Sequence, residues 1–342
     1  MTGFVTAVED GAAVVRVPGL ADAGEVRLRC DLDLADTGFS RVDAGWELRL
    51  AELPVDRLEY LVEVDGATRP DPTHDRVVPG PFGPHSWLPL PGYAEPDWVA
   101  WEQVASEQSA VLVEDTPVGD VEVEVWAPAD ADGEEPLPML CCHDGPEMAA
   151  YGGLLDWAGA LIGAGRLPRM RIALLAPGAR NERYAANPAY AEALVGHVVP
   201  VLQTACPSNH RPVLVGQSLG GLAALHAAWT GPGCFAGLML QSGSFFTPEL
   251  DPQESDFEHW DEVTGFVAGL LADSTAAPDP PLVAMTCGSA EENYANNVLV
   301  RDHLAATGVA VEWGEVRQGH TWTCWRDTLD PHLTDLLNRV WG

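Results

Sequence analysis

The sequence contains no lysine. All 18 basic residues are arginines, against 51 aspartates and glutamates, so the formal net charge is −33. Such an acidic surface repels phosphate backbones and anionic lipid headgroups, which argues against nucleic acid or a membrane as partner. Long apolar runs are also lacking, and the first residues have neither the basic start nor the apolar stretch of a secretory signal. These absences predict a cytoplasmic protein.

Paired-cysteine motifs are missing as well. The seven cysteines are an odd number, and none of them forms a C-x-x-C motif or a Cys/His spacing suited to zinc. Cys141 and Cys142 are adjacent in a strand-like run, which places their side chains on opposite faces. We therefore expect reduced thiols, no metal site and no cofactor.

What is present divides into two parts. Residues 1–105 carry short apolar alternations separated by Gly, Asp and Pro, which predicts a small β-sandwich domain. Residues 69–98 are crowded with proline and glycine, so we expect an ordered loop or linker there. Residues 106–342 alternate strand-like runs with helical stretches, which predicts a mostly parallel sheet with helices on both faces.

The strand-like runs of the second part lie at 121–128, 139–145, 171–178, 212–218, 236–243, 282–289 and 309–316. The helical stretches lie at 152–165, 190–205, 219–229 and 326–341. Ligand sites in such sheets lie beyond the carboxyl ends of the strands. The polar residues that follow the strand-like runs are therefore the candidates for chemistry.

One of these strand ends carries a Gly-x-Ser-x-Gly motif, Gly216-Gln217-Ser218-Leu219-Gly220. An apolar strand precedes it and a helical stretch rich in small residues follows it, as in the α/β-hydrolase fold. A sharp turn there lifts the Ser218 hydroxyl clear of the backbone. The alternative is a tight packing corner without chemistry. The motif in its context predicts that Ser218 is a nucleophile.

A serine nucleophile needs a base, and in this fold the histidine comes last along the chain. His320 lies just after the last strand-like run, where a loop can return it to the nucleophile. His303 and His332 fall within helical stretches, and His259 in irregular sequence. We expect His320 to be the base, against the alternative of a polar loop histidine that caps the following helix.

The acid is expected after the strand-like run at 282–289. Glu291 lies three residues past Gly288, a usual place for it, and would orient the imidazole of His320. Glu292 is a second candidate and Asp327 a third. Either glutamate is alternatively a surface charge at the start of a helix.

The transition state of acyl transfer needs two backbone N–H groups that bind the oxyanion. One is expected from Leu219, directly after the nucleophile. The other is expected from the loop after the run at 139–142, where Pro146 has no N–H to give. Gly145 or Glu147 must then supply it, and we prefer Gly145.

These motifs together resemble a known family. GHTWTCWR after the last strand, GQSLGGLAAL at the serine turn and the HDG loop look like enterochelin (enterobactin) esterase, a siderophore hydrolase of the esterase D-like α/β-hydrolases. The stretches EYLVEVDGATRPDP and HSWLPLPGY are similar to the early-set immunoglobulin-like domain that precedes the hydrolase in such enzymes. The resemblance therefore covers nearly the whole chain.

The resemblance implies a cytoplasmic serine esterase that cleaves the ester bonds of catecholate trilactone siderophores, free or iron-bound, for iron release. The family's serine and histidine correspond to Ser218 and His320, and its acid to Glu291. Pro146 departs from the family, which usually has an N–H donor at that position. No cofactor is implied, since iron arrives with the substrate.

Such a substrate is anionic and aromatic. Arg180 and Arg183, at a strand end, suit catecholate oxygens, although pairing of these arginines with Glu182 is the alternative. Trp322 and Trp325 flank His320 and suit stacking on an aromatic ring or covering an arginine face, and ordinary packing is the alternative for both. The sequence leaves the siderophore and the oligomeric state open.

Three rival functions remain. A carbohydrate-linked feruloyl or acetyl esterase would use the same fold, but such an enzyme is expected to be exported. An acyltransferase would replace water with an alcohol. A non-catalytic binding protein on a hydrolase scaffold would be expected to lose Ser218, His320 or the acid, and all three are present.

Overall fold

The chain folds into two compact units. The computed structural model describes residues 4–275 and 279–342. The first unit holds the chain up to Glu95 together with Gly288–Glu291 and Val316–Cys324. The second holds Pro96–Cys287, Glu292–Glu315 and Trp325–Gly342. The division into domains at residue 105 stays a prediction.

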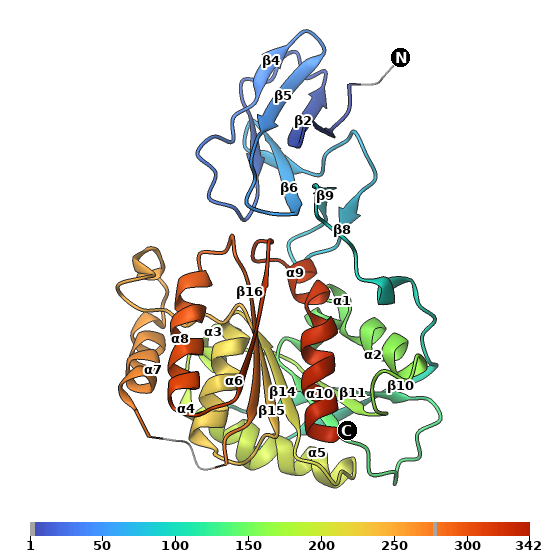
Figure 1. Cartoon of the computed structure of the whole chain (residues 1–342), viewed down its shortest axis with the longest axis vertical. Helices are drawn as coiled ribbons and strands as arrows, with labels where there is room; N and C mark the ends of the chain where they lie inside the picture. Colours follow the sequence, from blue (N-terminus) through green and yellow to red (C-terminus); the bar gives the residue numbers. More distant parts are fainter. Residues whose placement is uncertain (1–3, 276–278) are drawn as a thin grey trace. The chain divides into compact units, whose positions relative to one another are not determined.

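Antiparallel strands make up the first unit. One sheet has the order β1-β2-β5-β4, and the other has the order β3-β6-β9-β8 with β7 paired to β6 (Figure 1). Their bounds are β1 Ala7–Glu9, β2 Ala12–Pro18, β3 Val26–Arg29, β4 Ser40–Val42, β5 Gly45–Leu50, β6 Arg57–Val64, β7 Ala67–Arg69, β8 Val77–Val78 and β9 His85–Pro89.

The two sheets share one apolar core, as a β-sandwich requires. Val15 and Leu48 contribute to it from the first sheet, and Leu28, Leu58 and Val62 from the second. Alternate residues of a strand point to opposite faces, so inward Leu58 and Val62 leave the odd-numbered residues of β6 on the outer face. The predicted sandwich is confirmed.

The expectation of a loop or linker over residues 69–98 was wrong for part of that segment. It contains β8 and β9, and β9 lies inside its sheet between β6 and β8. Proline avoids central strands because it lacks an N–H. Here the prolines stand around β9 or at its last residue, Pro89, so the ladder along Ser86–Leu88 stays intact.

An eight-stranded sheet forms the centre of the second unit, in the order β10-β11-β13-β12-β14-β15-β16-β17. β10 and β11 are antiparallel, and β13, β12, β14, β15 and β16 run parallel. The predicted mostly parallel sheet is confirmed, and β10 is a strand that the sequence reasoning missed. The bounds are β10 Ser106–Val113, β11 Val121–Pro128, β12 Met139–Cys142, β13 Arg171–Leu175, β14 Val213–Gln217, β15 Gly237–Gln241, β16 Leu282–Gly288 and β17 Val311–Val316.

Helices cover both faces of this sheet (Figure 1). α6 and α8 share an apolar cluster with one face, through residues such as Leu222 and Val300. α2 and α10 lie on the other face, joined by a 3.3 Å hydrogen bond from Trp157 to Thr334. The helices are α1 Gly145–Ala150, α2 Leu154–Gly163, α3 Arg180–Tyr184, α4 Pro188–Glu192, α5 Val199–Ala205, α6 Leu219–Thr230, α7 Trp260–Ala272, α8 Tyr294–Ala306, α9 Trp322–Asp327 and α10 Thr334–Trp341.

Four 3₁₀ and π-helical segments are also present in the described chain. Two are 3₁₀ turns, η1 Asp97–Ala100 and η3 Pro252–Glu254, and two are π-helical, η2 Ala193–Val198 and η4 Leu329–Leu333. The expected closing helix over 326–341 is broken: Asp330 has φ −111° and ψ 124°, outside the helical region. The cause is Pro331, because a proline disfavours helical backbone at the residue before it.

No helix in residues 4–275 and 279–342 combines the length and the apolar character that crossing a bilayer would require.

Candidate active site

Ser218 occupies a strained turn between β14 and α6. Its backbone has φ 54° and ψ −124°, which a serine rarely adopts. Strain of this kind persists only where the surrounding fold imposes it, and it is concentrated at functional sites. A sharp strand-to-helix turn with a half-buried serine is the arrangement of a nucleophile elbow.

Gly216 makes this turn possible. A Cβ at that position would lie 2.0 Å from the carbonyl oxygen of Gly220, a backbone atom that cannot move away. The turn therefore brings two backbone segments closer than any side chain permits. This is the physical reason for the first glycine of the motif.

The last residue of β15 and the segment after it hold the turn in place. The backbone N–H of Ser218 donates to Gln241 at 2.9 Å, and Ser244 donates its N–H to the Ser218 carbonyl at 3.1 Å. The hydroxyl oxygens of Ser218 and Ser244 are 3.3 Å apart. Ser218 thus has its backbone fixed on both sides, and its hydroxyl makes a long polar contact to Ser244.

The predicted oxyanion donors come from neighbouring strand ends. Leu219 begins α6 after β14, and Gly145 begins α1 after β12, which pairs with β14. A Cβ on Gly145 would lie 2.3 Å from the Cα of Leu174, so glycine is required there. The use of the Leu219 and Gly145 N–H groups for an oxyanion stays a prediction.

His143 connects these two strand ends, and the sequence reasoning missed it. Its backbone N–H donates to Val215 at 2.9 Å, and its Nδ1 donates to the Gly220 carbonyl at 3.0 Å. Burial lowers the pKa of the imidazole to about 3, so the ring is neutral. A polar residue directly after the apolar run at 139–142 was the available signal.

The two candidate substrate arginines both have protein partners. Arg180 donates to both carboxylate oxygens of Asp144, with Nε–Oδ1 and Nη2–Oδ2 distances of 2.8 Å. This partner differs from Glu182, which the sequence suggested. Arg183 donates to the backbone carbonyls of Val118 and Asp120 at 3.1 and 3.2 Å. The Arg180 side chain remains 37% exposed, so it is accessible to a ligand.

His320 and Glu291 lie together in the first unit. The Nδ1 atom of His320 is 2.7 Å from Oε2 of Glu291, whose side chain is fully buried. The other oxygen of Glu291 accepts the Gly288 N–H at 2.7 Å, whereas Glu292 is exposed. Because Nδ1 donates to the carboxylate, Nε2 is the atom left to accept a proton. That His320 serves Ser218 stays a prediction.

The loop that carries His320 is fastened to the β-sandwich. The carboxylate of Asp31 accepts the backbone N–H of His320. Three residues earlier, the Arg317 carbonyl accepts the Asp56 N–H at 2.7 Å, and the Arg317 side chain donates to Asp56 at 3.0 Å. The sandwich therefore positions the predicted base, a role the sequence did not reveal.

The two tryptophans near His320 differ. Trp322 begins α9 and is half-buried. Trp325 is 6% exposed and donates its indole N–H to Ser242 at 3.1 Å, so it packs in the interior.

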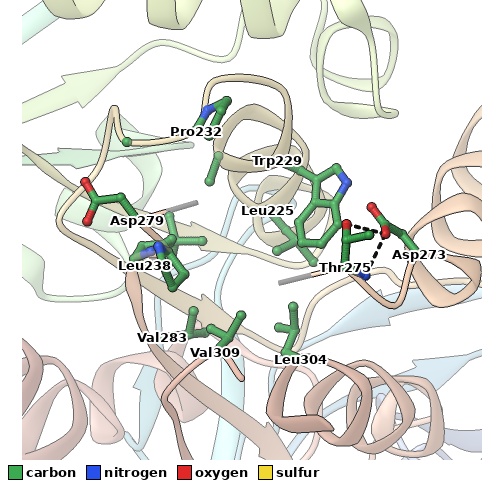
Figure 2. A pocket seen from close by; sticks show the side chains of 14 residues that line it. Leu225, Trp229, Pro232, Leu238, Asp273, Thr275, Asp279, Val283, Leu304 and Val309 are labelled. Atoms are coloured by element: carbon green, nitrogen blue, oxygen red, sulfur yellow. Dashed lines mark hydrogen bonds between the residues drawn. The ribbon is translucent and has the colours of Figure 1, made fainter. Parts of the chain in front are cut away.

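A cavity of about 150 Å³ lies at the amino ends of the parallel strands, away from the end of the sheet that carries Ser218. Figure 2 shows Leu225 of α6, Leu238 and Val283 near the amino ends of β15 and β16, and Asp273 bonded to Thr275 at its rim. Ligand sites of parallel sheets lie at the carboxyl ends, so this cavity is separate from the Ser218 turn.

Among residues 4–275 and 279–342, no three His, Cys, Asp or Glu side chains are grouped as metal ligands. All seven cysteines are free thiols.

Comparison with known proteins identifies the family. The profile of the family described as "Putative esterase" matches residues 116–336, more than half of the chain. The chain belongs to this esterase family. The match contains β14, Ser218, Glu291 and His320.

Two curated relatives carry more specific names. The chain is 27% identical over 215 residues to the iron(III) enterobactin esterase of Dickeya dadantii, covering 60% of this chain and 49% of that one. It is 26% identical over 220 residues to the iron(III) salmochelin esterase of Escherichia coli O6:H1, covering 61% and 52%. The matched part spans about half the length of these relatives.

Solved structures extend the likeness to both units. The enterobactin esterase of Shigella flexneri, determined in the presence of enterobactin, gives a TM-score of 0.80 at 17% identity, covering 99% of this chain and 97% of that one. A ferulic acid esterase gives 0.59 at 17% identity, covering 69% and 99%. At these identities the likeness shows the fold, and the predicted resemblance to the enterobactin esterases is confirmed.

Proposed function

We propose that this protein is a serine esterase that hydrolyses the ester bonds of a catecholate trilactone siderophore through an acyl-enzyme. The observation that carries the proposal is the strained turn at Ser218, with its φ of 54° between β14 and α6. Membership of the esterase family supports the reaction class. The names of the enterobactin and salmochelin esterases support the substrate class. A cytoplasmic location stays a prediction.

In the proposed reaction, Nε2 of His320 takes the proton of the Ser218 hydroxyl as its oxygen attacks the ester carbonyl. Glu291 holds the Nδ1–H and stabilises the imidazolium. The N–H groups of Leu219 and Gly145 bind the oxyanion. His320 then protonates the leaving alcohol, and water, activated in the same way, hydrolyses the acyl-enzyme. Any iron belongs to the substrate.

Substrate contacts are proposed for the exposed part of Arg180, for Arg183 and for Trp322. Asp144 binds and orients the Arg180 guanidinium, and the Arg180 side chain is still 37% exposed. Arginine N–H groups favour anionic catecholate oxygens. Arg183 is held by two backbone carbonyls, so its contribution would be mainly its charge. A half-buried Trp322 offers a ring for stacking.

The test combines substrate and nucleophile. Wild-type protein, Ser218→Ala and the exposed-serine control Ser255→Ala are each incubated with a ferric tris-catecholate trilactone, and products are followed by mass spectrometry. We expect stepwise release of catecholoyl-serine units by wild type and control, and a loss of at least about 10³-fold in Ser218→Ala. A fluorophosphonate probe labels Ser218 in parallel.

Each other outcome selects a rival. Labelling of Ser218 without siderophore cleavage would keep the serine esterase and direct the search to carbohydrate-linked esters. Ester formation in the presence of an added alcohol, faster than hydrolysis, would indicate an acyltransferase. No labelling and no cleavage would indicate a binding protein on the hydrolase fold.

A further inference from the structure

A buried arginine lies on the outer face of the β-sandwich. Arg57 of β6 has a side chain only 2% exposed, and the next outward residue, Glu59, is 11% exposed. The guanidinium lies 4.3 Å from the ring centroid of Trp87 and 5.5 Å from that of Tyr93. These aromatic faces hold its position, since a cation is attracted to the face of a ring.

The polar atoms of this pair are incompletely satisfied. Nη2 of Arg57 forms an ion pair with Oε1 of Glu59 at 3.4 Å, a distance longer than that of an ordinary hydrogen bond. Nε and Nη1 of Arg57 and Oε1 of Glu59 are buried without a hydrogen-bond partner. Buried donors and acceptors are nearly always paired in native proteins, and a charged group left unpaired is costly. Two N–H donors of Arg57 and one carboxylate acceptor of Glu59 are therefore suited to a group that both accepts and donates a hydrogen bond.

The same two side chains line a small pocket in the first unit. Asp31, Gln318 and Thr321 are among the other lining residues. Its free volume is about 10 Å³, enough for roughly one oxygen atom. Gln318 and Thr321 stand on the two sides of His320 in the chain, and Asp31 accepts the His320 N–H. The pocket is thus built into the loop of the predicted base.

The charges around the pocket select the chemistry of its occupant. Arg57 contributes one positive charge, while Asp31 and Glu59 contribute two negative ones. An anionic oxygen would meet net repulsion, and a cation would meet the guanidinium. A neutral hydroxyl fits both sides, because its oxygen accepts from Arg57 while its proton is donated to Glu59.

We propose that the Arg57–Glu59 pocket binds a hydroxyl group of the ester substrate. This inference rests on the proposed function, because it assigns to the substrate of His320 the hydroxyl that the pocket receives. A neutral ring hydroxyl of an iron-free catechol and a hydroxyl of a sugar share this chemistry. The pocket would then discriminate between esters by the presence of a hydroxyl, since a site built to bond a hydroxyl rejects the analogue that lacks it.

The test uses matched esters and a double variant. Arg57→Met/Glu59→Met replaces the whole pair by apolar chains of similar length, which proteins usually tolerate better than removal of one partner. The control, Arg29→Met/Glu63→Met, removes an exposed pair between β3 and β6 with a 2.7 Å contact. The first substrate pair is N-(2,3-dihydroxybenzoyl)serine methyl ester and N-benzoylserine methyl ester. The second is a mono-acetylated methyl glucoside and its O-methylated analogue.

We expect wild type and control to prefer the hydroxylated member of one pair by about ten- to hundred-fold in kcat/KM. In the Arg57→Met/Glu59→Met variant the preference should fall to near one, because kcat/KM for the hydroxylated ester falls more than kcat/KM for the unhydroxylated one. The substrate pair for which the variant loses its preference shows whether the pocket binds a ring hydroxyl or a sugar hydroxyl. Arg57→Lys, which keeps the charge but loses the fork of donors, should give an intermediate preference.

Three results would overturn the proposal. A preference retained in a folded double variant would mean that the pocket holds a trapped water only. Equal loss on both members of a pair would mean that Arg57 and Glu59 act on structure alone. Absence of any preference in wild type would exclude the subsite.

A binding measurement separates this proposal from the proposed function. Calorimetry on the Ser218→Ala protein compares 2,3-dihydroxybenzoate with benzoate, and methyl glucoside with its O-methylated analogue, with and without the double substitution. If wild type cleaves no ester and Ser218 is not labelled, the esterase function fails. A hydroxyl-dependent affinity that the double substitution abolishes would still support the pocket, and equal affinities in both pairs would overturn it.

Discussion

At the scale of single residues, two carboxylates hold His320 from different directions. Glu291 binds the Nδ1 atom of the ring at 2.7 Å. Asp31 binds the backbone N–H of the same residue, 289 positions away in the chain. A general base must keep its position within a fraction of an ångström for efficient proton transfer, so fixing both backbone and ring suits that role.

Replacement of Asp31 should therefore lower catalysis without removing the base. We expect Asp31→Ala to reduce kcat for N-benzoylserine methyl ester by about tenfold with little change in KM, since a charge-assisted hydrogen bond to the His320 backbone is lost. Asp31→Asn keeps an oxygen acceptor and should restore most of the rate. The exposed neighbour variant Asp33→Ala is the control. If Asp31→Asn is as slow as Asp31→Ala, the hydrogen bond is not the cause.

His143 is a second residue whose environment has a measurable consequence. It is fully buried against the rings of Tyr184 and Tyr190, with centroids 4.8 and 5.7 Å away. Burial lowers its pKa from 6.5 to about 3, so the unfolded chain binds a proton there that the folded chain does not. The contribution of neutral His143 to the free energy of unfolding is therefore complete above pH 6.5 and is lost as the pH falls towards 3.

This predicts a pH slope in the free energy of unfolding. Between about pH 6 and pH 4, His143 should contribute up to about 1.4 kcal/mol per pH unit, and His143→Asn should remove that contribution. Denaturant titrations of both proteins at several pH values measure it. Identical slopes in wild type and variant would show that the buried imidazole is not responsible.

The residues of the site differ in how visible they were in the sequence. Ser218, Glu291 and His320 stand next to strand ends within recognisable motifs, so local pattern was enough to single them out. Asp31 lies among several exposed acidic residues, and nothing local separates it from Asp33. Arg57 looked like an ordinary outward residue of a strand. Contacts between positions so far apart in the chain depend on tertiary folding, which composition and spacing do not encode.

At the scale of elements, the β14–α6 unit depends on the close approach at Gly216. The segment Val213–Gln217 is buried along its whole length, and α6 packs directly behind it. Any change in the turn therefore moves both elements. The hydroxyl of Ser218 would move with them.

Gly216→Ala is expected to lower the free energy of unfolding by about 3 kcal/mol, because the new Cβ meets a backbone oxygen at 2.0 Å. Gly269→Ala in α7 is the matched control. No atom lies within 4 Å of its Cβ position, so it should be stabilising by about 0.5–1 kcal/mol. Chemical denaturation measures both. A Gly216→Ala protein as stable as wild type would show that the turn can relax.

Element prediction succeeded where one physical effect dominates. Buried strands such as β11, Val121–Pro128, show as continuous or alternating apolar runs. β9 was missed because prolines surround it, although within the strand only its last residue, Pro89, is a proline. The closing helix was drawn through Asp330, where the pattern is helical but the backbone before Pro331 is not. In both cases a shift of one or two residues in the position of a proline decides whether the segment forms the expected secondary structure.

At the scale of the whole molecule, the chain passes between its two units five times. The first unit takes Gly288–Glu291 and Val316–Cys324 from a sequence that otherwise belongs to the second. The two short segments continue directly from β16 and β17. Loss of the first unit's structure would therefore release the loops at the ends of two strands of the eight-stranded sheet.

We accordingly expect one cooperative unfolding transition. Differential scanning calorimetry should give a single endotherm with a van't Hoff enthalpy close to the calorimetric one. Loss of ester hydrolysis and loss of tertiary circular dichroism should coincide with it. Two resolved endotherms would show that the units unfold independently despite the shared segments.

The fastening of the His320 loop to the sandwich also limits how this protein can be recombined with its relatives. A chimera joined at Glu95 would combine one parent's Asp31 and Asp56 with the other parent's Arg317 and His320. Modular exchange at that boundary would therefore break inherited pairs even when both parents share the fold. A functional graft of the first unit would have to transfer its three separate segments of sequence together. The first unit therefore cannot be exchanged as one continuous piece of chain.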